Sequence, residues 1–356
     1  MKRPLLAAAL AGASALWIPH PTGTDAELRG LAVLDAHHAW ASGSGGTIVR
    51  TRDGEHWEKL APPSGGEKLD FRDVETLGGD VVVLMSAGTR DAARIYRSTD
   101  AGASWTLSDT NPDKDGFYDA LAFWDAKDGL VMGDPVGGRF VVRVTSDGGA
   151  TWRVPEGLTM PAALPNEGAF AASGTCLFAL KGGRDAWFVT GGAAVARVFH
   201  TTDRGRTWSV ANTPAPNGNA SSGLFSVAFL DARRGFSAGG DYKQPGFQGL
   251  NGIRTEDGGA TWTPAPLSAT GFYSAVVAVP GAKDELVAVG LAGQAVSRDA
   301  GRTWSKTGDA PMNAVAFGAP DAGWAVGPKG SALRSRSDWI PTLYGAPPSS
   351  PTSSPR

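Results

Sequence analysis

Four acidic residues that lie on or beside short apolar segments carry the sharpest chemical possibility in this chain. Two carboxyl groups that meet in one cleft can hydrolyse a glycosidic bond, one as the general acid and the other as a base or nucleophile. Spacing along the chain does not show which of these groups converge, so a carbohydrate-active hydrolase is kept as the alternative to a binding function. The four residues are Asp73, Asp119, Glu167 and Asp241.

Polar and aromatic side chains also recur at corresponding places in successive segments, where they would surround a shared surface. Such a surface could bind a protein or a small ligand. Charged residues also occur at such places without any ligand, simply because water fills the space that they surround. The long segment 239–252 is either a functional loop or a variable one. The predicted ligand-binding residues are Arg72, Asp73, Tyr118, Asp119, Glu167, Asp241, Tyr242, Lys243 and Tyr273, with Arg29, Phe225 and Asn313 in similar positions.

Residues for metal, thiol or nicotinamide chemistry do not occur in the patterns that such chemistry requires. None of the five histidines stands at ligand spacing from a cysteine or a carboxylate cluster. The single cysteine, Cys176, leaves no C-x-x-C pair and no internal disulfide. No G-x-G-x-x-G follows a strand and opens a helix. We therefore predict no metal and no cofactor.

A repeat positions these residues. The pattern [ST]-x-D-x-G-x-[ST]-W occurs five times, a shortened copy precedes the five, and an eroded copy follows them. The closing tryptophans stand at positions 57, 105, 152, 208, 262, 304 and 339. A period of roughly 40 to 50 residues is typical of a propeller blade.

The repeat is interpreted as a hairpin turn. Its Asp can accept backbone N–H groups, its Gly can adopt positive φ, and its hydroxyl groups can close the ends of the turn. Its Trp is large enough to fill the wedge between adjacent sheets. The predicted structural residues are Asp53, Asp100, Trp105, Asp147, Trp152, Asp203, Trp208, Asp257, Trp262, Asp299 and Trp304.

Four short strand signals accompany each turn, which predicts an all-β, seven-bladed β-propeller over residues 16–344. Residues 16–19 resemble the strands that follow the other turns and are expected to close the ring. The Pro- and Ser-rich residues 345–356 are expected to be disordered.

The net charge and the amino-terminal segment limit which partners and which cellular location we expect. The formal net charge is −2 and no basic stripe is visible, which argues against nucleic acid as a partner. Lys2 and Arg3, the apolar residues that follow them and Ala13-Ser14-Ala15 have the form of a signal peptide over residues 1–15. No later segment is apolar enough to span a membrane. The prediction is an exported, periplasmic or secreted protein, and a monomer.

The turns resemble the Asp-box (BNR) repeats of sialidases and related propellers. The fuller unit is similar to the photosystem II assembly and stability factor-like propellers, and stretches such as Asp70-Phe71-Arg72-Asp73 resemble a secreted bacterial subgroup that often carries an oxidoreductase label. The early R-[IL]-P signature of sialidases is absent, since the nearest string is Arg94-Ile95-Tyr96. Because the recurring residues serve the turns and no compact catalytic signature occurs, and because the resemblance is to assembly-factor propellers, we predict a non-catalytic binding or assembly scaffold first, a sialidase-like or other glycosidase with carboxylates in the central funnel second, and an oxidoreductase last.

Overall fold

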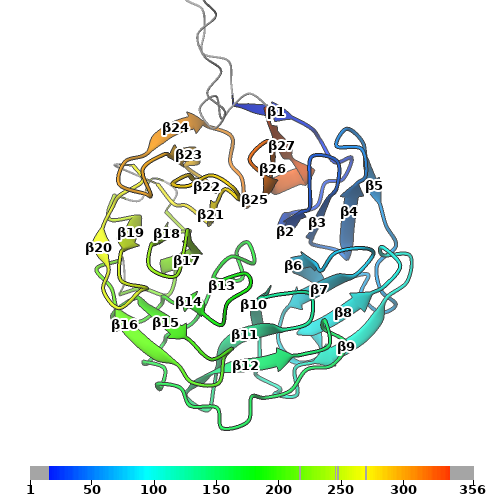
Figure 1. The fold of residues 1–356 in the computed structure, drawn as a ribbon. Helices are drawn as coiled ribbons and strands as arrows, with labels where there is room; N and C mark the ends of the chain where they lie inside the picture. Colours follow the sequence, from blue (N-terminus) through cyan, green and yellow to red (C-terminus); the bar gives the residue numbers. More distant parts are fainter. Residues whose placement is uncertain (1–15, 216–217, 245, 247, 269–270, 337–356) are drawn as a thin grey trace, which may run out of the picture.

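The strands of the described residues form seven antiparallel sheets arranged in a ring (Figure 1), and their innermost strands line a central channel. The computed structural model describes residues 16–215, 218–244, 246, 248–268 and 271–336. The helical content of these residues is two single 3₁₀ turns, Arg90–Ala92 and Pro328–Gly330. None of this part of the chain forms a helix with the length and apolarity to cross a membrane. The protein is a seven-bladed β-propeller, as the repeat predicts.

The blades follow one another in chain order, each with its first strand innermost. Blade 1 contains β2 (Leu28–Val33), β3 (Ala39–Gly43), β4 (Thr47–Thr51) and β5 (Trp57–Lys59); blade 2 contains β6 (Asp70–Thr76), β7 (Val82–Ala87), β8 (Arg94–Ser98) and β9 (Thr106–Thr110); blade 3 contains β10 (Tyr118–Phe123), β11 (Gly129–Val136) and β12 (Arg139–Thr145); blade 4 contains β13 (Leu177–Ala179), β14 (Ala186–Val189), β15 (Arg197–Thr201) and β16 (Ser209–Asn212).

The remaining blades have the same order of strands. Blade 5 contains β17 (Ser222–Phe229), β18 (Gly235–Asp241), β19 (Gly252–Thr255) and β20 (Thr263–Pro264); blade 6 contains β21 (Ala275–Ala278), β22 (Leu286–Gly290), β23 (Gly293–Ser297) and β24 (Ser305–Gly308); blade 7 contains β25 (Ala314–Ala319), β26 (Ala322–Val326), β27 (Ala332–Ser335) and β1 (Trp17–Pro19).

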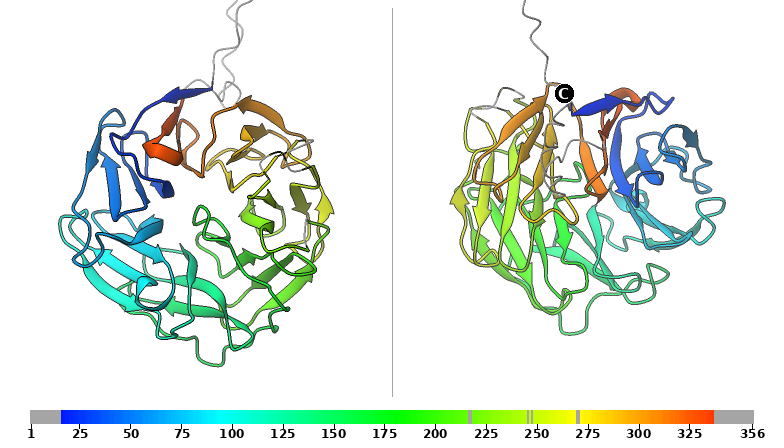
Figure 2. Two further views of the ribbon diagram at one scale, coloured as in Figure 1. Left: turned by 180° about the vertical axis from the view of Figure 1, so that it is seen from behind. Right: turned by 45° about the horizontal axis from the view of Figure 1, so that its top comes forward.

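The ring closes by pairing the two ends of the described chain. Strand β1 lies antiparallel to β27, with Ile18 opposite Arg334, so the amino-terminal strand supplies the outer strand of the last blade (Figure 2). This confirms the closing strand expected from residues 16–19. The predicted signal peptide, the Asp338–Trp339 copy of the repeat and the carboxy-terminal residues 345–356, for which disorder was predicted, lie outside the described residues.

Blade 3 departs from the expected four strands. After its turn the chain makes only the isolated bridge between Val144 and Arg153 and then leaves the sheet. Pro155 follows two residues later, and a proline has no N–H to continue the ladder. The segment then covers the blade with apolar side chains, among them Met160, which is 7% exposed.

The repeat turns are held by the hydrogen bonds that their composition predicts. Asp147 accepts the N–H of Thr151 at 2.9 Å, and the Thr145 hydroxyl bridges the Asp147 carboxylate and the Gly149 N–H. Partial burial opposes ionisation of Asp147, but the hydrogen bonds from Thr151 and Thr145 outweigh it and lower its pKa. Equivalent bonds form around Asp100, Asp203, Asp257 and Asp299.

Four of the described turns, those at Asp53, Asp100, Asp147 and Asp257, also connect their blade to the preceding blade. In each of them the carbonyl of the residue after the turn aspartate accepts a hydrogen bond from the neighbouring sheet. Arg97 of blade 2 donates to Gly148 of blade 3 at 2.8 Å, and Arg334 of blade 7 donates to Gly54 of blade 1 at 2.9 Å. In blade 4 a tryptophan takes this role, since the indole N–H of Trp187 donates to Gly258 of blade 5 at 2.8 Å.

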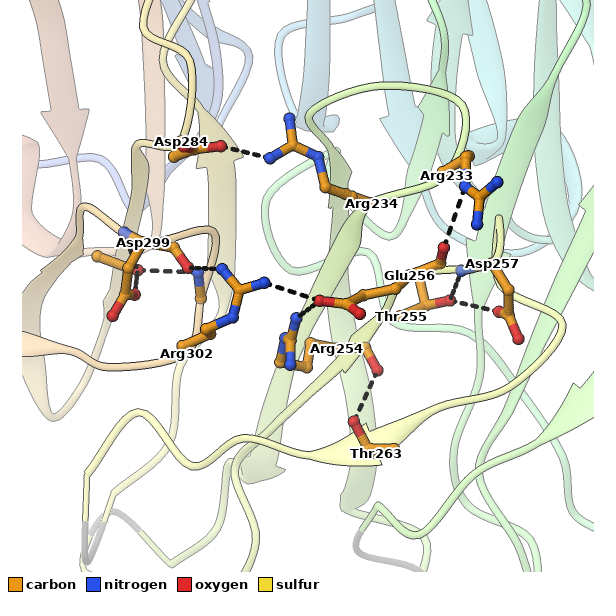
Figure 3. Close-up of polar contacts among 12 residues, drawn as sticks. Arg233, Arg234, Arg254, Thr255, Glu256, Asp257, Thr263, Asp284, Asp299 and Arg302 are labelled. Atoms are coloured by element: carbon orange, nitrogen blue, oxygen red, sulfur yellow. Dashed lines mark hydrogen bonds and ion pairs between the residues drawn. The ribbon is translucent and has the colours of Figure 1, made fainter.

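Ion pairs reinforce the outer rim between blades 5 and 6 (Figure 3). Glu256, in the turn of blade 5, accepts both Arg254 of its own blade and Arg302 of the next, the latter at 2.9 Å. Arg234 binds Asp284 across the same boundary. These exposed pairs each contribute little to stability, so the burial of apolar side chains between the sheets has the larger effect.

The turn tryptophans pack between sheets to different extents. Trp152, Trp208 and Trp262 are only 6–7% exposed. Trp152 contacts Phe123 of its own blade edge-on and lies in one apolar cluster with Val83 of blade 2. The corresponding Trp57, Trp105 and Trp304 are half-buried. The turn tryptophans therefore fill the wedge between adjacent sheets most completely in the middle of the chain.

Candidate functional site

The innermost strands of four blades contain an irregularity at the same level of the channel. The strand pairing shifts register between Leu28 and Gly30, Phe71 and Asp73, Tyr118 and Ala120, and Leu224 and Ser226. A one-residue bulge re-aims the side chain of the residue that it leaves unpaired. The residues left unpaired by these bulges are Arg29, Arg72, Asp119 and Phe225.

All four bulge residues line one pocket at the end of the channel where the innermost strands begin. The pocket has a volume of about 490 Å³. A concave site of this size with convergent polar and aromatic groups is typical of a ligand site. Its other lining residues are Glu27, Phe117, Asp134, Ala169, Phe170, Ala171, Ala172, Tyr242, Phe272, Leu291 and Asn313.

The two arginines in the pocket already have carboxylate partners. Arg72 donates to Asp70 at 2.8 Å and to the Ala171 carbonyl at 3.0 Å. Arg29 lies 3.4 Å from Glu27 and donates to the Ala172 carbonyl at 3.1 Å. Burial and the positive charge of Arg72 lower the pKa of Arg29. Their guanidinium groups therefore hold the loop 169–172 against blades 1 and 2.

Two carboxyl groups face the pocket from neighbouring strands of blade 3. Asp119 stands on the bulge of β10, and Asp134 stands on β11 where the pairing with β12 shifts between Gly133 and Pro135. Asp134 accepts the N–H of Ala169 at 2.9 Å. Asp119 is 1% exposed, and neither of its oxygens has a hydrogen-bond partner among the described residues.

Burial is the main cause that raises the pKa of Asp119 well above its usual value, and the charge of Asp134 adds to the effect. The Arg72 guanidinium and the nearby amides of Ala171 and Asp134, which lie outside hydrogen-bonding geometry, offset it only in part. Burial likewise raises the pKa of Asp134. The pair therefore resists carrying two negative charges.

Aromatic rings form the opposite wall of the pocket. Phe170 stacks on Phe225 with ring centroids 3.9 Å apart, and Phe272 meets Phe225 edge-on at 4.7 Å. Tyr242, which is 43% exposed, contacts both Phe170 and Phe225 edge-on. The ammonium of Lys243 lies over the Tyr242 ring, 5.8 Å from its centroid.

The structure thus brings Arg72, Asp119 and Tyr242 together in the pocket, with Lys243 at its edge. Asp73 points away from it: this carboxyl accepts the N–H of Leu121 at 2.8 Å and lines the opposite end of the channel. Because a bulge separates Arg72 from Asp73, these neighbours project to different ends of the channel.

Four further predicted residues have structural partners outside the pocket. Glu167 is buried in an ion pair with Arg197 and accepts the hydroxyl of Thr190 at 2.7 Å. Tyr118 donates to Asp109 at 2.6 Å, away from the channel. Asp241 accepts the Lys243 N–H at 3.0 Å and so closes a turn, and Tyr273 is buried with its hydroxyl 3.4 Å from Ser268.

Sequence reasoning missed Asp134, Phe170 and Phe272 as pocket residues. Asp134 does leave a signal, because an acidic residue before Pro135 interrupts the apolar run of residues 130–132 at the end of a strand. The two phenylalanines precede innermost strands without any local feature that separates them from core residues.

Two other cavities are weaker candidates. The opposite end of the channel has a cavity of about 540 Å³ that is mostly apolar, with Glu75 and Lys181 at its edge. A larger cavity of about 740 Å³ lies on the outer rim between the turns of blades 3 and 4, where Arg204 pairs with Asp128. Neither cavity is lined by a buried side-chain atom that lacks a hydrogen-bond partner. Among the described residues, no cluster of three metal-ligating side chains occurs.

The comparisons with known proteins concern the fold. No family model and no curated protein matches the chain. Among solved structures, one of YCF48 bound to a D1 peptide is similar, with a TM-score of 0.64 and 19% identity over 93% of this chain and 97% of that one. The likeness is one of fold.

Other propellers show how widely that fold is shared. The GH74 xyloglucanase from Xanthomonas campestris aligns with a TM-score of 0.57 and 16% identity over 94% of this chain and 55% of its own. The RRP9 WD40 repeats align with a TM-score of 0.61 and 12% identity over 91% of this chain and 98% of that chain. Because one fold serves several functions, the likeness of fold does not by itself give the function of this protein.

Proposed function

We propose that the protein is a non-catalytic binding scaffold that takes a peptide segment of a partner protein in the channel-mouth pocket. The observation that carries the proposal is the convergence of four bulge residues on one pocket, while the repeated Asp and Trp residues serve the turns and the core. The YCF48 structure, which holds a D1 peptide, supports a peptide as the type of ligand.

The walls of the pocket suit such a ligand. A half-exposed tyrosine beside stacked phenylalanines provides a rigid apolar surface for a side chain, and the rim supplies polar groups that can pair with a peptide backbone. Asn313, Arg29 and Asp119 approach from different blades. A ligand that contacts all three would bind to a preformed site, so the protein would lose little conformational entropy on binding.

A random-peptide display library panned against the full chain tests the proposal. Enriched peptides should bind the wild-type protein, and Tyr242→Ala should weaken their binding at least about tenfold, as expected for loss of a central aromatic contact. Leu107→Ala on the outer strand β9, where Leu107 is 50% exposed, is the matched control and should leave binding unchanged. Peptides that bind both variants alike would contradict the proposal.

A glycoside hydrolase is the second candidate, because Asp119 and Asp134 share one cavity. A panel of xyloglucan and aryl glycosides, assayed with the wild type and with Asp119→Asn, decides between the two. Turnover by the wild type that disappears in folded Asp119→Asn would replace the binding proposal. Glu167 is unsuitable for this test, since its removal would leave the buried Arg197 without a charged partner.

We also propose that the protein acts outside the cytoplasm, on the basis of residues 1–15. Amino-terminal sequencing of the protein recovered from the periplasm or the medium should begin near residue 16. An intact Met1 on protein from the cytosol would contradict export.

A further inference from the structure

The carboxyl group of Asp119 is the one feature of the pocket that the fold itself does not explain. It is buried, neither of its oxygens accepts a hydrogen bond from the part of the chain that the structure describes, and it lines the pocket beside Asp134. Leaving a buried polar group unpaired costs about 1–3 kcal/mol, and more for a charged one. Unpaired buried groups of this kind occur where a ligand, an ion or a proton completes the site.

The charges around Asp119 indicate which kind of ligand would complete it. Arg72 and Arg29 are each paired with a carboxylate, Asp70 and Glu27 respectively, so these two ion pairs nearly cancel. Among the described residues, neither Asp119 nor Asp134 forms an ion pair, and the Arg72 guanidinium offsets the burial of Asp119 only in part. A negatively charged ligand group would be repelled by these two carboxyl groups, whereas a positively charged group would be attracted to both.

The aromatic wall favours the same sign of charge. The faces of aromatic rings carry negative potential and attract ammonium and guanidinium groups within about 6 Å. Tyr242 already holds the ammonium of Lys243 over its ring. Phe170 and Tyr242 contact each other across the pocket wall from separate loops, so a basic side chain that enters would lie between rings and carboxyl groups.

We propose that Asp119 and Asp134 form a subsite for a basic group, the ammonium or guanidinium of a lysine or arginine side chain of the bound peptide. This inference rests on the peptide-binding function proposed above and names the residue type that the pocket selects. The cation would pair with the Asp119 carboxylate and favour its charged form, so binding would be accompanied by release of a proton wherever Asp119 is protonated beforehand.

The groups that face Asp119 are few, which makes proton release a specific signal. They are Asp134 on β11, Arg72 on β6 and the buried thiol of Cys176, whose pKa burial and the charge of Asp119 both raise. A cation that binds here favours the charged form of Asp119. An anion that binds at the arginines would instead favour its neutral form and release no proton from it.

Calorimetry on the full chain tests the inference with two probes of matched length, n-butylammonium and pentanoate. Titration near pH 6 in buffers of different ionisation enthalpy measures proton release. Butylammonium should bind with release of protons, and pentanoate should not. Asp119→Asn should weaken butylammonium binding at least about tenfold, the loss expected for one charge-assisted hydrogen bond. Asp321→Asn, an exposed acidic residue in the β25–β26 hairpin, is the control and should bind as the wild type does.

The melting temperature of Asp119→Asn, which should equal or exceed that of the wild type, shows that the variant folds. Absence of butylammonium binding, or binding that Asp119→Asn retains, overturns the inference. If panned peptides require Tyr242 but carry no lysine or arginine, the inference is wrong while the peptide-binding function stands.

Discussion

Asp119 and Asp134 stand on bulges of neighbouring strands, β10 and β11, and face the same cavity from one blade. A bulge re-aims the side chain that it leaves unpaired, and each carboxyl group stands at such a shift in strand register, so both can face the cavity. The protein thereby holds a buried acid, Asp119, and a half-buried acid, Asp134, together at the mouth of its channel.

Because of this arrangement, we expect the free energy of unfolding to fall as pH rises. Because burial raises the pKa of Asp119 above its unfolded value, the folded state binds more protons, and the contribution of Asp119 to stability falls as pH rises above about 4 toward the raised pKa. Asp119→Asn should therefore raise the free energy of unfolding at pH 7 by about 1–2 kcal/mol. Urea unfolding at pH 4.5 and pH 7 measures it. A variant that is less stable at pH 7 would show that the carboxylate has a stabilising partner.

The turn aspartates should behave in the opposite way. Hydrogen bonds from Thr151 and Thr145 lower the pKa of Asp147, so its contribution is present above the unfolded pKa and is lost as pH falls toward its lowered value. Asp147→Ala should cost about 1 kcal/mol at pH 7 and leave peptide binding intact. Thermal unfolding together with a binding titration checks both parts. Loss of binding with an unchanged melting temperature would assign the turn a functional role.

Substitution of a buried turn tryptophan should destabilise the fold more than substitution of a turn aspartate. Trp208 is 6% exposed and packs edge-on against Phe188 at 5.0 Å. Trp208→Ala should cost about 3–5 kcal/mol, because the cavity that it leaves cannot collapse between two sheets. The half-buried Trp304 provides a comparison, and Trp304→Ala should cost less. Equal losses at the two sites would contradict the difference in packing.

One turn position carries backbone strain that a single substitution can relieve. Ala300 has φ of 60°, in the left-handed region, where the equivalent residues of two other turns are Gly148 and Gly258. Ala300→Gly should raise the free energy of unfolding by about 0.5–1 kcal/mol, because glycine adopts this conformation without steric cost. Ala325→Gly, within the extended strand β26, is the control and should lower it. Destabilisation by both changes would show that the turn is unstrained.

The contrast between turns and pocket shows what the sequence determines locally. Asp147 and Thr151 are four residues apart, so their hydrogen bond follows from the composition of one short segment, and the same logic predicts every complete turn. The closing strand over residues 16–19 was also predictable, since its residues repeat those that follow the other turns. Both features depend on near neighbours or on repetition.

The pocket depends on β-bulges, and no local sequence pattern predicts where these bulges occur. Strict alternation leaves open whether Arg72 or Asp73 faces the channel mouth, and both were predicted as ligand-binding residues; the bulge of β6 selects Arg72. Tyr118 and Asp119 present the same ambiguity, and the bulge of β10 turns Tyr118 toward Asp109. The partner of Glu167 is Arg197, thirty residues later, which no local pattern indicates.

A crystal structure of the full chain with a panned peptide would show directly where the peptide binds. Peptide density is expected in the channel-mouth pocket, against Tyr242 and within hydrogen-bonding distance of Asp119. Density on the outer rim, in the cavity between the turns of blades 3 and 4, would contradict the proposed function.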